Sequence, residues 1–358
     1  MSRIFRGEFL AKVLLAVAAM TVLCVGMAAH SAKPATDPFT VAVIPDTQYY
    51  CSTSPPAPTA DIGTAEMYYD LTAWLKKHAA KEKMRFAIHL GDLIQDPANE
   101  DEWKIADAAQ RTLEWSLPYS VLPGNHDTDQ KTHEDALYDK YFGPQRFADQ
   151  KFYGGHEGTK NNNNYCFFEG GGMKFMVLSI EYKPSAAVLA WANQVVADHP
   201  DHRVIVATHS YLNNDGSYTK DGGQDIRNKL VRRNDNIFMV IGGHVPGWCH
   251  RKSFNDHGRP VLEILTDYQW EPNGRSPEQY GGNGWLNLMR FVPSENKIHF
   301  SSYSPYLDRW WKDDPLHEYT LDYQMVPAPS ALPFLVAALL AVCAWRFRWP
   351  LFKRQGNG

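Results

Sequence analysis

Five short polar motifs occur in order along this 358-residue chain, and each contains a side chain that can bind a metal ion. Carboxylate, amide and imidazole groups are common protein ligands of divalent cations. The motifs are Asp46-Thr47-Gln48, Gly91-Asp92, Gly124-Asn125-His126-Asp127, Thr208-His209 and Gly243-His244. A single Gly-Asp or Gly-Asn pair is more often a turn than a ligand. The ordered set, and no single motif, therefore predicts a metal site.

The motifs share a position relative to the predicted strands. Each one follows an apolar run that is typical of a buried β-strand. These runs are residues 41–44, 85–90, 119–122, 203–207 and 236–241. Ligand sites in α/β sheets lie at the carboxyl ends of strands. We therefore expect the five motifs to converge on one crevice.

The elements around these strands indicate the fold class. Helix-like patterns at 64–80, 101–113, 185–196 and 225–233 alternate with the five strands and a sixth at 173–180. Strand-then-helix alternation predicts an α/β layered fold. After His244 three strand-like runs follow without helices between them, at 261–265, 285–291 and 298–303. We expect these three to form an antiparallel set that completes the sheets.

The motif set resembles that of the calcineurin-like metallophosphoesterase superfamily. The family pattern is Asp-x-His, Gly-Asp, Gly-Asn-His-Asp/Glu, a lone His and Gly-His-x-His. The likeness extends to Leu90-Gly91-Asp92, to the run from Pro123 to Asp127 and to Asp267-Tyr268-Gln269, and it is greatest for a secreted subgroup with Asp-Thr-Gln at the first motif. The resemblance implies an α/β fold, a four-layer αββα metallophosphoesterase sandwich with two mixed β-sheets, and a two-metal centre.

The resemblance also implies a role for each candidate residue. Asp46 and Gln48 would bind the first ion, Asp92 would bridge both ions, and the second ion would be completed by Asn125, His209 and His244. His126 would donate a proton to the leaving oxygen or stabilise its charge, and Asp127 would orient the His126 imidazole through a hydrogen bond. The implied cofactor is one or two divalent metal ions, with Mn²⁺, Zn²⁺, iron and Mg²⁺ all open.

The implied activity is that of a metal-dependent phosphoric ester hydrolase. A metal-activated hydroxide would attack a phosphomonoester or phosphodiester substrate in line. The alternative is a cell-surface binding protein that keeps the fold but has lost turnover. The His126-Asp127 pair favours the enzyme, because a decayed site has little reason to keep it. Neither a Gly-x-Ser-x-Gly elbow nor a His-Glu-x-x-His helix occurs in the sequence.

Two positions depart from the family pattern. Gln48 replaces the histidine of the first motif, and Pro246 replaces the second histidine of Gly-His-x-His. Both positions serve the first metal in the family, so we expect a weak first site that favours harder ions such as Mn²⁺ or Mg²⁺. His250 is a candidate substitute, with a solvated loop histidine as the alternative. His89, inside an apolar run, is expected to be a core histidine.

The two ends of the chain are predicted to be targeting segments. Residues 1–32 combine basic residues, a short apolar run and small residues, as in a signal peptide; a retained membrane helix is the alternative. Residues 326–358 combine Val-Pro-Ala-Pro, an apolar run and a basic tail. This layout resembles the PEP-CTERM sorting signal of Gram-negative bacteria, with an ordinary membrane anchor as the alternative.

These segments imply export and delimit a catalytic domain at residues 33–325. The expected location is the periplasm, the outer surface or the extracellular matrix. Export machinery and an exosortase-type sorting enzyme would be partners. Without the two ends the body has about ten more acidic than basic side chains, so we expect no nucleic-acid-binding surface. In an oxidising compartment the three cysteines of the body permit one disulfide and leave one thiol free, with Cys51 and Cys249 as the first candidate pair.

Overall fold

The computed structural model describes residues 37–53, 64–129, 135–269 and 282–325. The predicted signal peptide (1–32) and sorting segment (326–358) lie outside these residues. The described part includes most of the predicted catalytic domain. Among the helices it contains, none has the length and apolarity that a membrane crossing requires.

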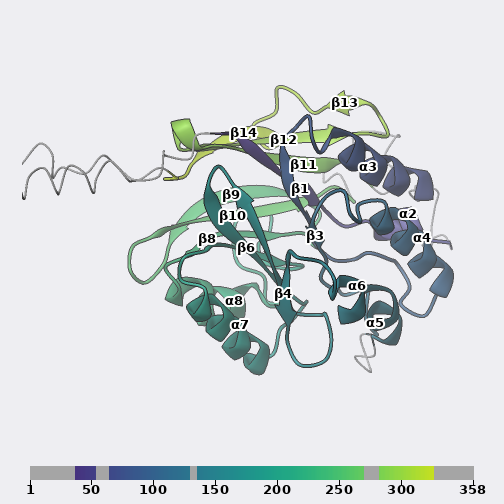
Figure 1. Ribbon diagram of the computed structural model, residues 1–358, viewed down its shortest axis with the longest axis horizontal. Helices are drawn as coiled ribbons and strands as arrows, with labels where there is room; N and C mark the ends of the chain where they lie inside the picture. The colour runs from purple at the N-terminus through teal and green to yellow at the C-terminus, as the bar shows by residue number, and fades with distance from the viewer. Residues whose placement is uncertain (1–36, 54–63, 130–134, 270–281, 326–358) are drawn as a thin grey trace, which may run out of the picture.

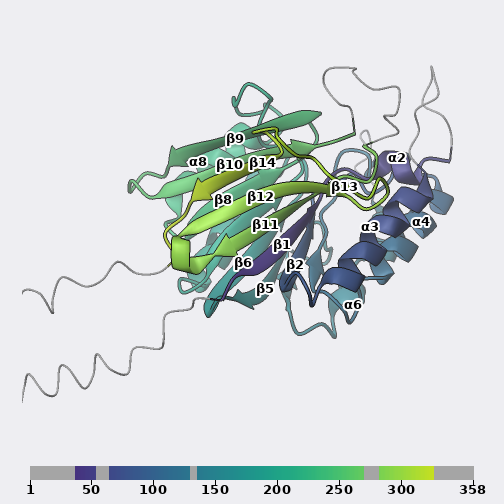
Figure 2. The ribbon, with the colours of Figure 1, turned by 90° about the horizontal axis from the view of Figure 1, so that it is seen from above.

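Two mixed β-sheets pack face to face (Figures 1 and 2). In the described residues the first sheet has the order β13-β12-β11-β1-β2-β3, with β14 also paired to β12, and the second has the order β4-β5-β6-β7-β8-β10-β9. The first sheet contains β1 (Phe39–Ile44), β2 (Met84–His89), β3 (Tyr119–Ser120), β11 (Leu286–Val292), β12 (Lys297–Ser304), β13 (Arg309–Trp310) and β14 (Glu318–Asp322). The second contains β4 (Tyr153–His156), β5 (Asn164–Gly170), β6 (Met173–Ile180), β7 (Arg203–Thr208), β8 (Ile237–Gly242), β9 (Gly247–Phe254) and β10 (Pro260–Asp267).

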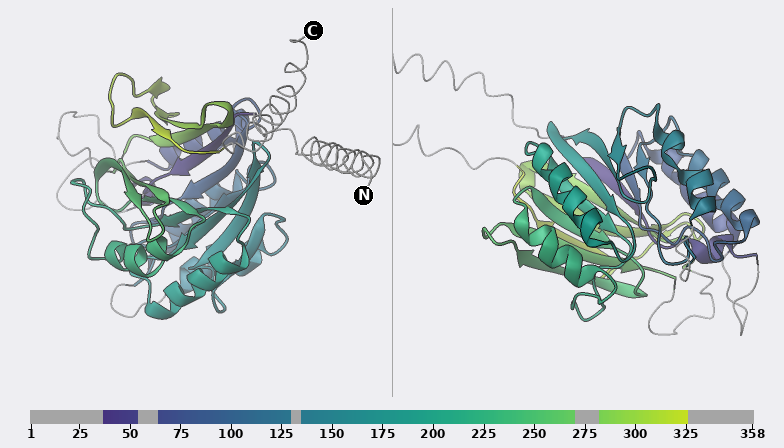
Figure 3. Two further views of the ribbon diagram at one scale, coloured as in Figure 1. Left: turned by 90° about the vertical axis from the view of Figure 1, so that its left-hand side faces the viewer. Right: turned by 90° about the horizontal axis from the view of Figure 1, so that it is seen from below.

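Helices cover the outer face of each sheet (Figure 3). The first sheet carries α3 (Ala65–His78) and α4 (Glu100–Arg111), and the second carries α7 (Ala186–Asp198) and α8 (Gly223–Lys229). Asn99 and Ser185 cap α4 and α7 by accepting hydrogen bonds from backbone N–H groups of the first turn. Shorter elements complete the layers: α2 (Gln48–Cys51), α5 (Ala136–Phe142), α6 (Pro144–Phe147), η1 (Val231–Arg233) and η2 (Pro293–Glu295).

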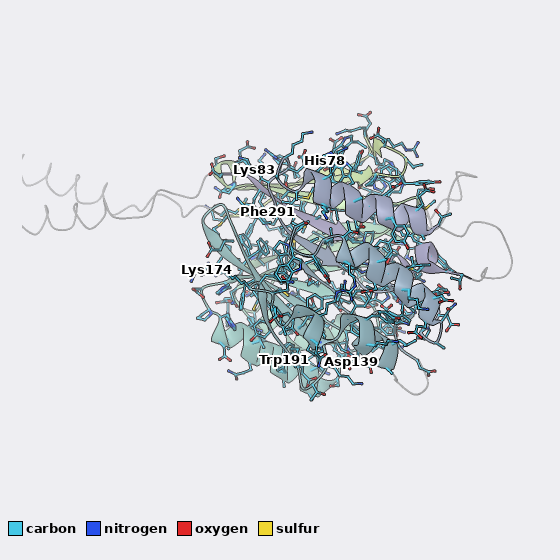
Figure 4. All side chains as sticks on the ribbon, turned by 45° about the vertical axis from the view of Figure 1, so that its right-hand side comes forward. His78, Lys83, Asp139, Lys174, Trp191 and Phe291 are labelled. Carbon is cyan, nitrogen blue, oxygen red and sulfur yellow. The ribbon has the colours of Figure 1, made fainter. Side chains whose placement is uncertain are left out.

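Three apolar clusters fill the three interfaces between the four layers. Alternation along β1 shows how the sequence builds them, because Val41 and Val43 face the second sheet while Ala42 and Ile44 face the helices. Figure 4 marks Phe291, which belongs to the cluster between the sheets. The predicted four-layer αββα arrangement with two mixed sheets is confirmed.

One strand pairs differently from the prediction. The run at 285–291 and the run at 298–303 form β11 and β12, which are antiparallel neighbours in the first sheet. The run at 261–265 forms β10, which lies in the second sheet, parallel to β8 and antiparallel to β9. The chain crosses from one sheet to the other between β10 and β11, so the three runs are not one antiparallel set.

The predicted disulfide is wrong. Cys51 and Cys249 are both free thiols, as is Cys166. Cys51 is buried between the first sheet and its helices, whereas Cys249 packs against the cluster between the second sheet and its helices. The two thiols belong to different layers of the sandwich and do not meet.

Candidate metal centre

The five motifs lie at the carboxyl ends of strands from both sheets. Asp46 follows β1, Asp92 follows β2, and the Gly124–Asp127 loop follows β3; His209 and His244 follow β7 and β8. β1, β2 and β3 are parallel, and so are β7 and β8, so the strand ends of each sheet share one edge. The motifs are brought together where the two edges meet.

Asp92, His209 and His244 form the imidazole-rich part of this cluster. One ligand atom from each residue lies within 4.8 Å of the others. The Nδ1 of His209 donates to the Leu90 carbonyl at 2.9 Å, which leaves Nε2 as the ligand atom. That Nε2 lies 2.9 Å from Asn125 Oδ1 and 3.3 Å from Asp92 Oδ1. A carboxylate, an amide oxygen and two imidazoles therefore share one small volume.

The charges in this part favour a bound cation. Burial opposes protonation of His209, but the carboxylates of Asp92 and Asp46 outweigh it and raise its pKa to about 10. Burial and the nearby His209 lower the pKa of His244 to about 4, so this imidazole is neutral and able to coordinate. Positive charge at His209, from a proton or from a metal ion, is stabilised by the two acids.

Asp46 lies on the other side of His244. Its Oδ1 and Oδ2 accept the His244 backbone N–H at 3.3 and 3.2 Å, and its Oδ2 accepts from Gln269 Nε2 at 3.2 Å. Burial, together with the charge of Asp267, raises the pKa of Asp46 well above its usual range. Gln48 is buried two residues further on, and its Oε1 has no hydrogen-bond partner in the part of the chain that is described.

Two glycines leave room for the carboxylates. A Cβ on Gly124 would lie 2.1 Å from Asp92 Oδ1, and a Cβ on Gly243 would lie 2.2 Å from Asp46 Oδ1. The backbones of Asp92 and His244 have φ values of 50° and 69°, a left-handed conformation that is rare for such residues. Strain of this kind is common at functional sites, and here two predicted ligands carry it.

His126 and Asp127 take different positions from those expected for a hydrogen-bonded pair. His126 Nδ1 donates to the Gln95 carbonyl at 2.8 Å, and its backbone N–H donates to Asp92 Oδ1 at 2.9 Å. The buried Asp127 carboxylate accepts backbone N–H groups of Leu93, Ile94 and Gly124. The predicted orienting bond from Asp127 to the imidazole is therefore wrong: the Gln95 carbonyl orients His126, and Asp127 ties two motif loops together.

Two other predicted histidines are also placed. His89 is 1% exposed, and its Nε2 lies 3.0 Å from Thr47 Oγ1, which confirms a core histidine that also supports the first motif. His250 lies in β9, with its ring stacked on Tyr319 at a centroid distance of 4.0 Å. It is neither a loop residue nor among the clustered metal-binding groups of the described residues.

Asp267 and Gln269, which belong to the resembling segment Asp267-Tyr268-Gln269, also lie at the centre. Asp267 is fully buried, and burial raises its pKa to about 6. Gln269 donates hydrogen bonds to both Asp267 and Asp46. The signal was available, because Asp267 follows an apolar strand in the same way as the five motif residues. Assigning that strand to an antiparallel set concealed it.

These residues fit a divalent-metal centre. Asp46, Asp92 and Asp267 are three buried carboxylates of this centre. No lysine or arginine of the described residues pairs with them. Buried charges require a counter-charge or a metal ion. The imidazoles of His209 and His244, the unpartnered Gln48 oxygen and the glycine spaces supply the remaining features of such a site.

The fold and the cluster define a four-layer α/β sandwich protein with metal-binding groups at the shared edge of its sheets. The family model described as calcineurin-like phosphoesterase matches residues 39–248, more than half of the chain. The chain belongs to this family, whose members are metal-dependent phosphoesterases.

The chain is similar to one protein of known sequence and, in fold, to solved structures. YvnB of Bacillus subtilis (strain 168), an uncharacterized protein, is 32% identical over 281 residues, which cover 76% of this chain and 20% of YvnB. The chain thus spans about a fifth of that relative's length. Purple acid phosphatase PPD1 from yellow lupin (Lupinus luteus) seeds shares the fold, with a TM-score of 0.50 at 11% identity over 83% of this chain and 58% of that one. A 5′-nucleotidase precursor from Thermus thermophilus gives a TM-score of 0.43 at 13% identity, over 87% of this chain and 59% of that one.

Proposed function

We propose that this chain is a hydrolase of phosphomonoesters or phosphodiesters that works with one or two divalent metal ions. The observation that carries the proposal is the convergence of Asp92, His209 and His244 beside Asp46, in a chain of the calcineurin-like phosphoesterase family. When bound, the ions would activate water and neutralise charge on the phosphoryl oxygens.

The protein's own groups have distinct tasks in this proposal. His126 lies beside Asp92, to whose carboxylate its backbone N–H donates at 2.9 Å. Because its Nδ1 is held by the Gln95 carbonyl, Nε2 is the nitrogen that can serve the leaving oxygen. Asp127 holds the loop after β3 against the loop after β2, and so keeps His126 beside Asp92.

Hydrolysis by the purified full-length chain tests the proposal. The chain is stripped with a chelator, reloaded separately with Mn²⁺, Zn²⁺, Fe²⁺ or Mg²⁺, and given generic aryl phosphate monoesters and diesters. We expect metal-dependent hydrolysis that is lost in Asp92→Asn and retained in Asp235→Asn, a control at a surface acid paired with His257. Hydrolysis that survives in both Asp92→Asn and His126→Ala would refute the assigned centre. Metal binding without turnover on either ester class would favour the alternative of a cell-surface binding protein.

We further propose that the protein works outside the cytoplasm. The support is the layout of residues 1–32 and 326–358, which resembles a signal peptide and a PEP-CTERM-like segment. Fractionation of cells that express the full chain, with mass measurement of the mature protein, tests this. A cytoplasmic product that retains its first residues would contradict export, and a mature protein that keeps residues 326–358 would favour an anchor over a cleaved sorting signal.

A further inference from the structure

The strand register places Asp267 beside the Gly243-His244 motif. β10 runs parallel to β8, and Leu265 pairs with Gly242. Asp267 and His244 each lie two residues beyond this pair. β10 also runs antiparallel to β9, where Asp267 is opposite Gly247, the residue after Pro246. The fold therefore brings a carboxylate next to the position at which Pro246 offers no side-chain ligand.

Gln269 connects this carboxylate to Asp46. Its backbone N–H donates to Asp267 Oδ1 at 2.9 Å, and its Nε2 donates to Asp267 Oδ2 at 2.8 Å and to Asp46 Oδ2 at 3.2 Å. One amide nitrogen that reaches two carboxylates shows that both acids converge on the same point.

The amide oxygen of Gln269 lacks a partner at this point. Gln269 is 8% exposed, and its Oε1 is buried without a hydrogen-bond partner among the residues that the structure covers. A buried carbonyl oxygen left in this way costs free energy unless a donor or a cation satisfies it. Because Oε1 and Nε2 are bonded to the same carbon, a half-turn of the amide about its Cγ–Cδ bond exchanges the two atoms and would put the oxygen where Nε2 now faces both carboxylates.

The acids here differ from Glu263, another buried acid of the fold. Glu263, also 0% exposed, forms an ion pair with Arg251 at 3.0 Å. Asp46 and Asp267 have no such pair with a lysine or arginine within the described ranges. Two buried carboxylates and an unpartnered amide oxygen at one point are the features of a cation site.

We propose that Asp46, Asp267 and Gln269 form an oxygen-only half of the metal centre that binds a hard cation such as Mn²⁺ or Mg²⁺. Oxygen ligands suit these ions, whereas the imidazoles of His209 and His244 suit zinc or iron. Asp267 and Gln269 lie beyond residue 248, where the match to the family model ends. The inference rests on the proposed function, because both concern the same metal centre. The first site is expected to bind weakly because Gln48 and Pro246 replace two histidines of the family pattern. Asp267 and Gln269 supply two further donors, so this reason for weak binding no longer holds.

Calorimetric titration of the chelator-stripped, full-length chain with Mn²⁺ tests this directly. Asp267→Asn and Gln269→Met keep side-chain size while changing the donor atoms. Asp221→Asn is the matched control, because it removes an acid whose charge reaches His244 but which is paired with Lys183 at the surface.

We expect the unchanged chain and Asp221→Asn to bind two Mn²⁺ ions. In Asp267→Asn one ion should remain, and the other should bind at least about tenfold more weakly. Gln269→Met should weaken the same ion, and it carries the test if Asp267→Asn fails to fold. Without metal, Asp267→Asn should unfold at the same or a higher temperature than the unchanged chain, because one of the converging charges is gone, while it gains less from added Mn²⁺.

Several results would overturn the inference. These are a single Mn²⁺ ion bound by the unchanged chain, two ions bound with unchanged affinity by Asp267→Asn and Gln269→Met, or a lower unfolding temperature of metal-free Asp267→Asn with an unchanged gain from Mn²⁺. The last result would give Asp267 a purely structural role. Loss of one ion in the variants of a chain that hydrolyses no phosphoester would support this inference and refute the proposed function.

Discussion

Gly124 has no room for a side chain, because the Asp92 carboxylate occupies the place where its Cβ would lie. An added Cβ would be 2.1 Å from Asp92 Oδ1, 2.5 Å from the Asp92 backbone nitrogen and 2.8 Å from its Cγ. Real Cβ atoms essentially never approach another heavy atom closer than 3.0 Å. In Gly124→Ala, either the loop after β3 or Asp92 itself must therefore move by about 1 Å.

This displacement should harm the metal centre more than the fold. Overpacking of this kind costs about 1–3 kcal/mol of unfolding free energy, and each kcal/mol lowers the unfolding temperature of a domain of this size by about 2–4 °C. A catalytic group misplaced by about 1 Å costs about a hundredfold in rate. We expect Gly124→Ala to fold, to lose a few degrees in unfolding temperature, and to lose about a hundredfold in kcat/KM together with metal affinity at Asp92.

Calorimetric metal titration, thermal unfolding and ester hydrolysis measure the three effects on one preparation. Gly258→Ala is the control, because its φ is +75° and nothing lies within 4 Å of an added Cβ, so it introduces backbone strain without a collision. Gly243→Ala is the companion, with its collision against Asp46 Oδ1 at 2.2 Å. Unchanged metal affinity and kcat/KM in Gly124→Ala would refute the assignment of Asp92 to the centre.

Three further outcomes are expected. Chelation should lower the unfolding temperature, and an ion added back at about 100 times its Kd should restore about 2.7 kcal/mol of unfolding free energy. An unfolding temperature that the chelator does not change would contradict a bound ion. His126→Ala should lower kcat by about 10²–10⁴-fold at unchanged metal stoichiometry, and altered stoichiometry would mean that His126 acts on the metal instead. Burial lowers the pKa of His317 to about 4, below the value of about 6.5 in the unfolded chain. The folded state therefore loses up to about 3 kcal/mol of stability as the pH falls from about 6.5 to about 4, because the buried ring must take up a proton. Urea unfolding across this range should show a flatter profile for His317→Phe, and an equal slope would contradict the assignment of that loss to His317.

The buried parallel strands could be predicted because their signal is local. Residues 41–44 and 203–207 are short apolar runs, and both lie in strands with helices on one face and the other sheet on the opposite face. Such strands have no polar face, so a continuous apolar run identifies them. The polar residue after each run then indicates the edge at which a ligand site forms.

β5 shows what a local signal leaves out. It begins at Asn164, at the end of a run of four asparagines whose composition is typical of a loop. In the fold, Asn164 Nδ2 donates to the carbonyls of Val121 and Asn161, both at 2.9 Å, and Asn163 forms hydrogen bonds with Glu181. The bonds to Val121 and to Glu181 span 43 and 18 residues, and no local propensity encodes them.

The roles of Asp127 and Gln95 were missed for a related reason. Asp127 adjoins His126 in sequence, so a direct bond between their side chains was the simplest expectation. Its carboxylate instead collects backbone N–H groups from two loops, and the Gln95 carbonyl, 31 residues away, fixes the imidazole. Backbone groups carry no side-chain signature, so a carbonyl that orients a histidine cannot be recognised from residue types.

His244 couples the two halves of the centre. Its imidazole lies with His209 and Asp92, at a ring-centroid distance of 4.8 Å from His209, while its backbone N–H donates to Asp46. The left-handed backbone, with φ of 69°, and the absence of a side chain at Gly243 make this double use possible. A cation that fixed the imidazole would also fix the N–H that holds Asp46, so filling one half would pre-organise the other. Replacement of the family's second histidine by Pro246 leaves this link intact, because the link depends on the backbone of His244 and on the carboxylate of Asp46.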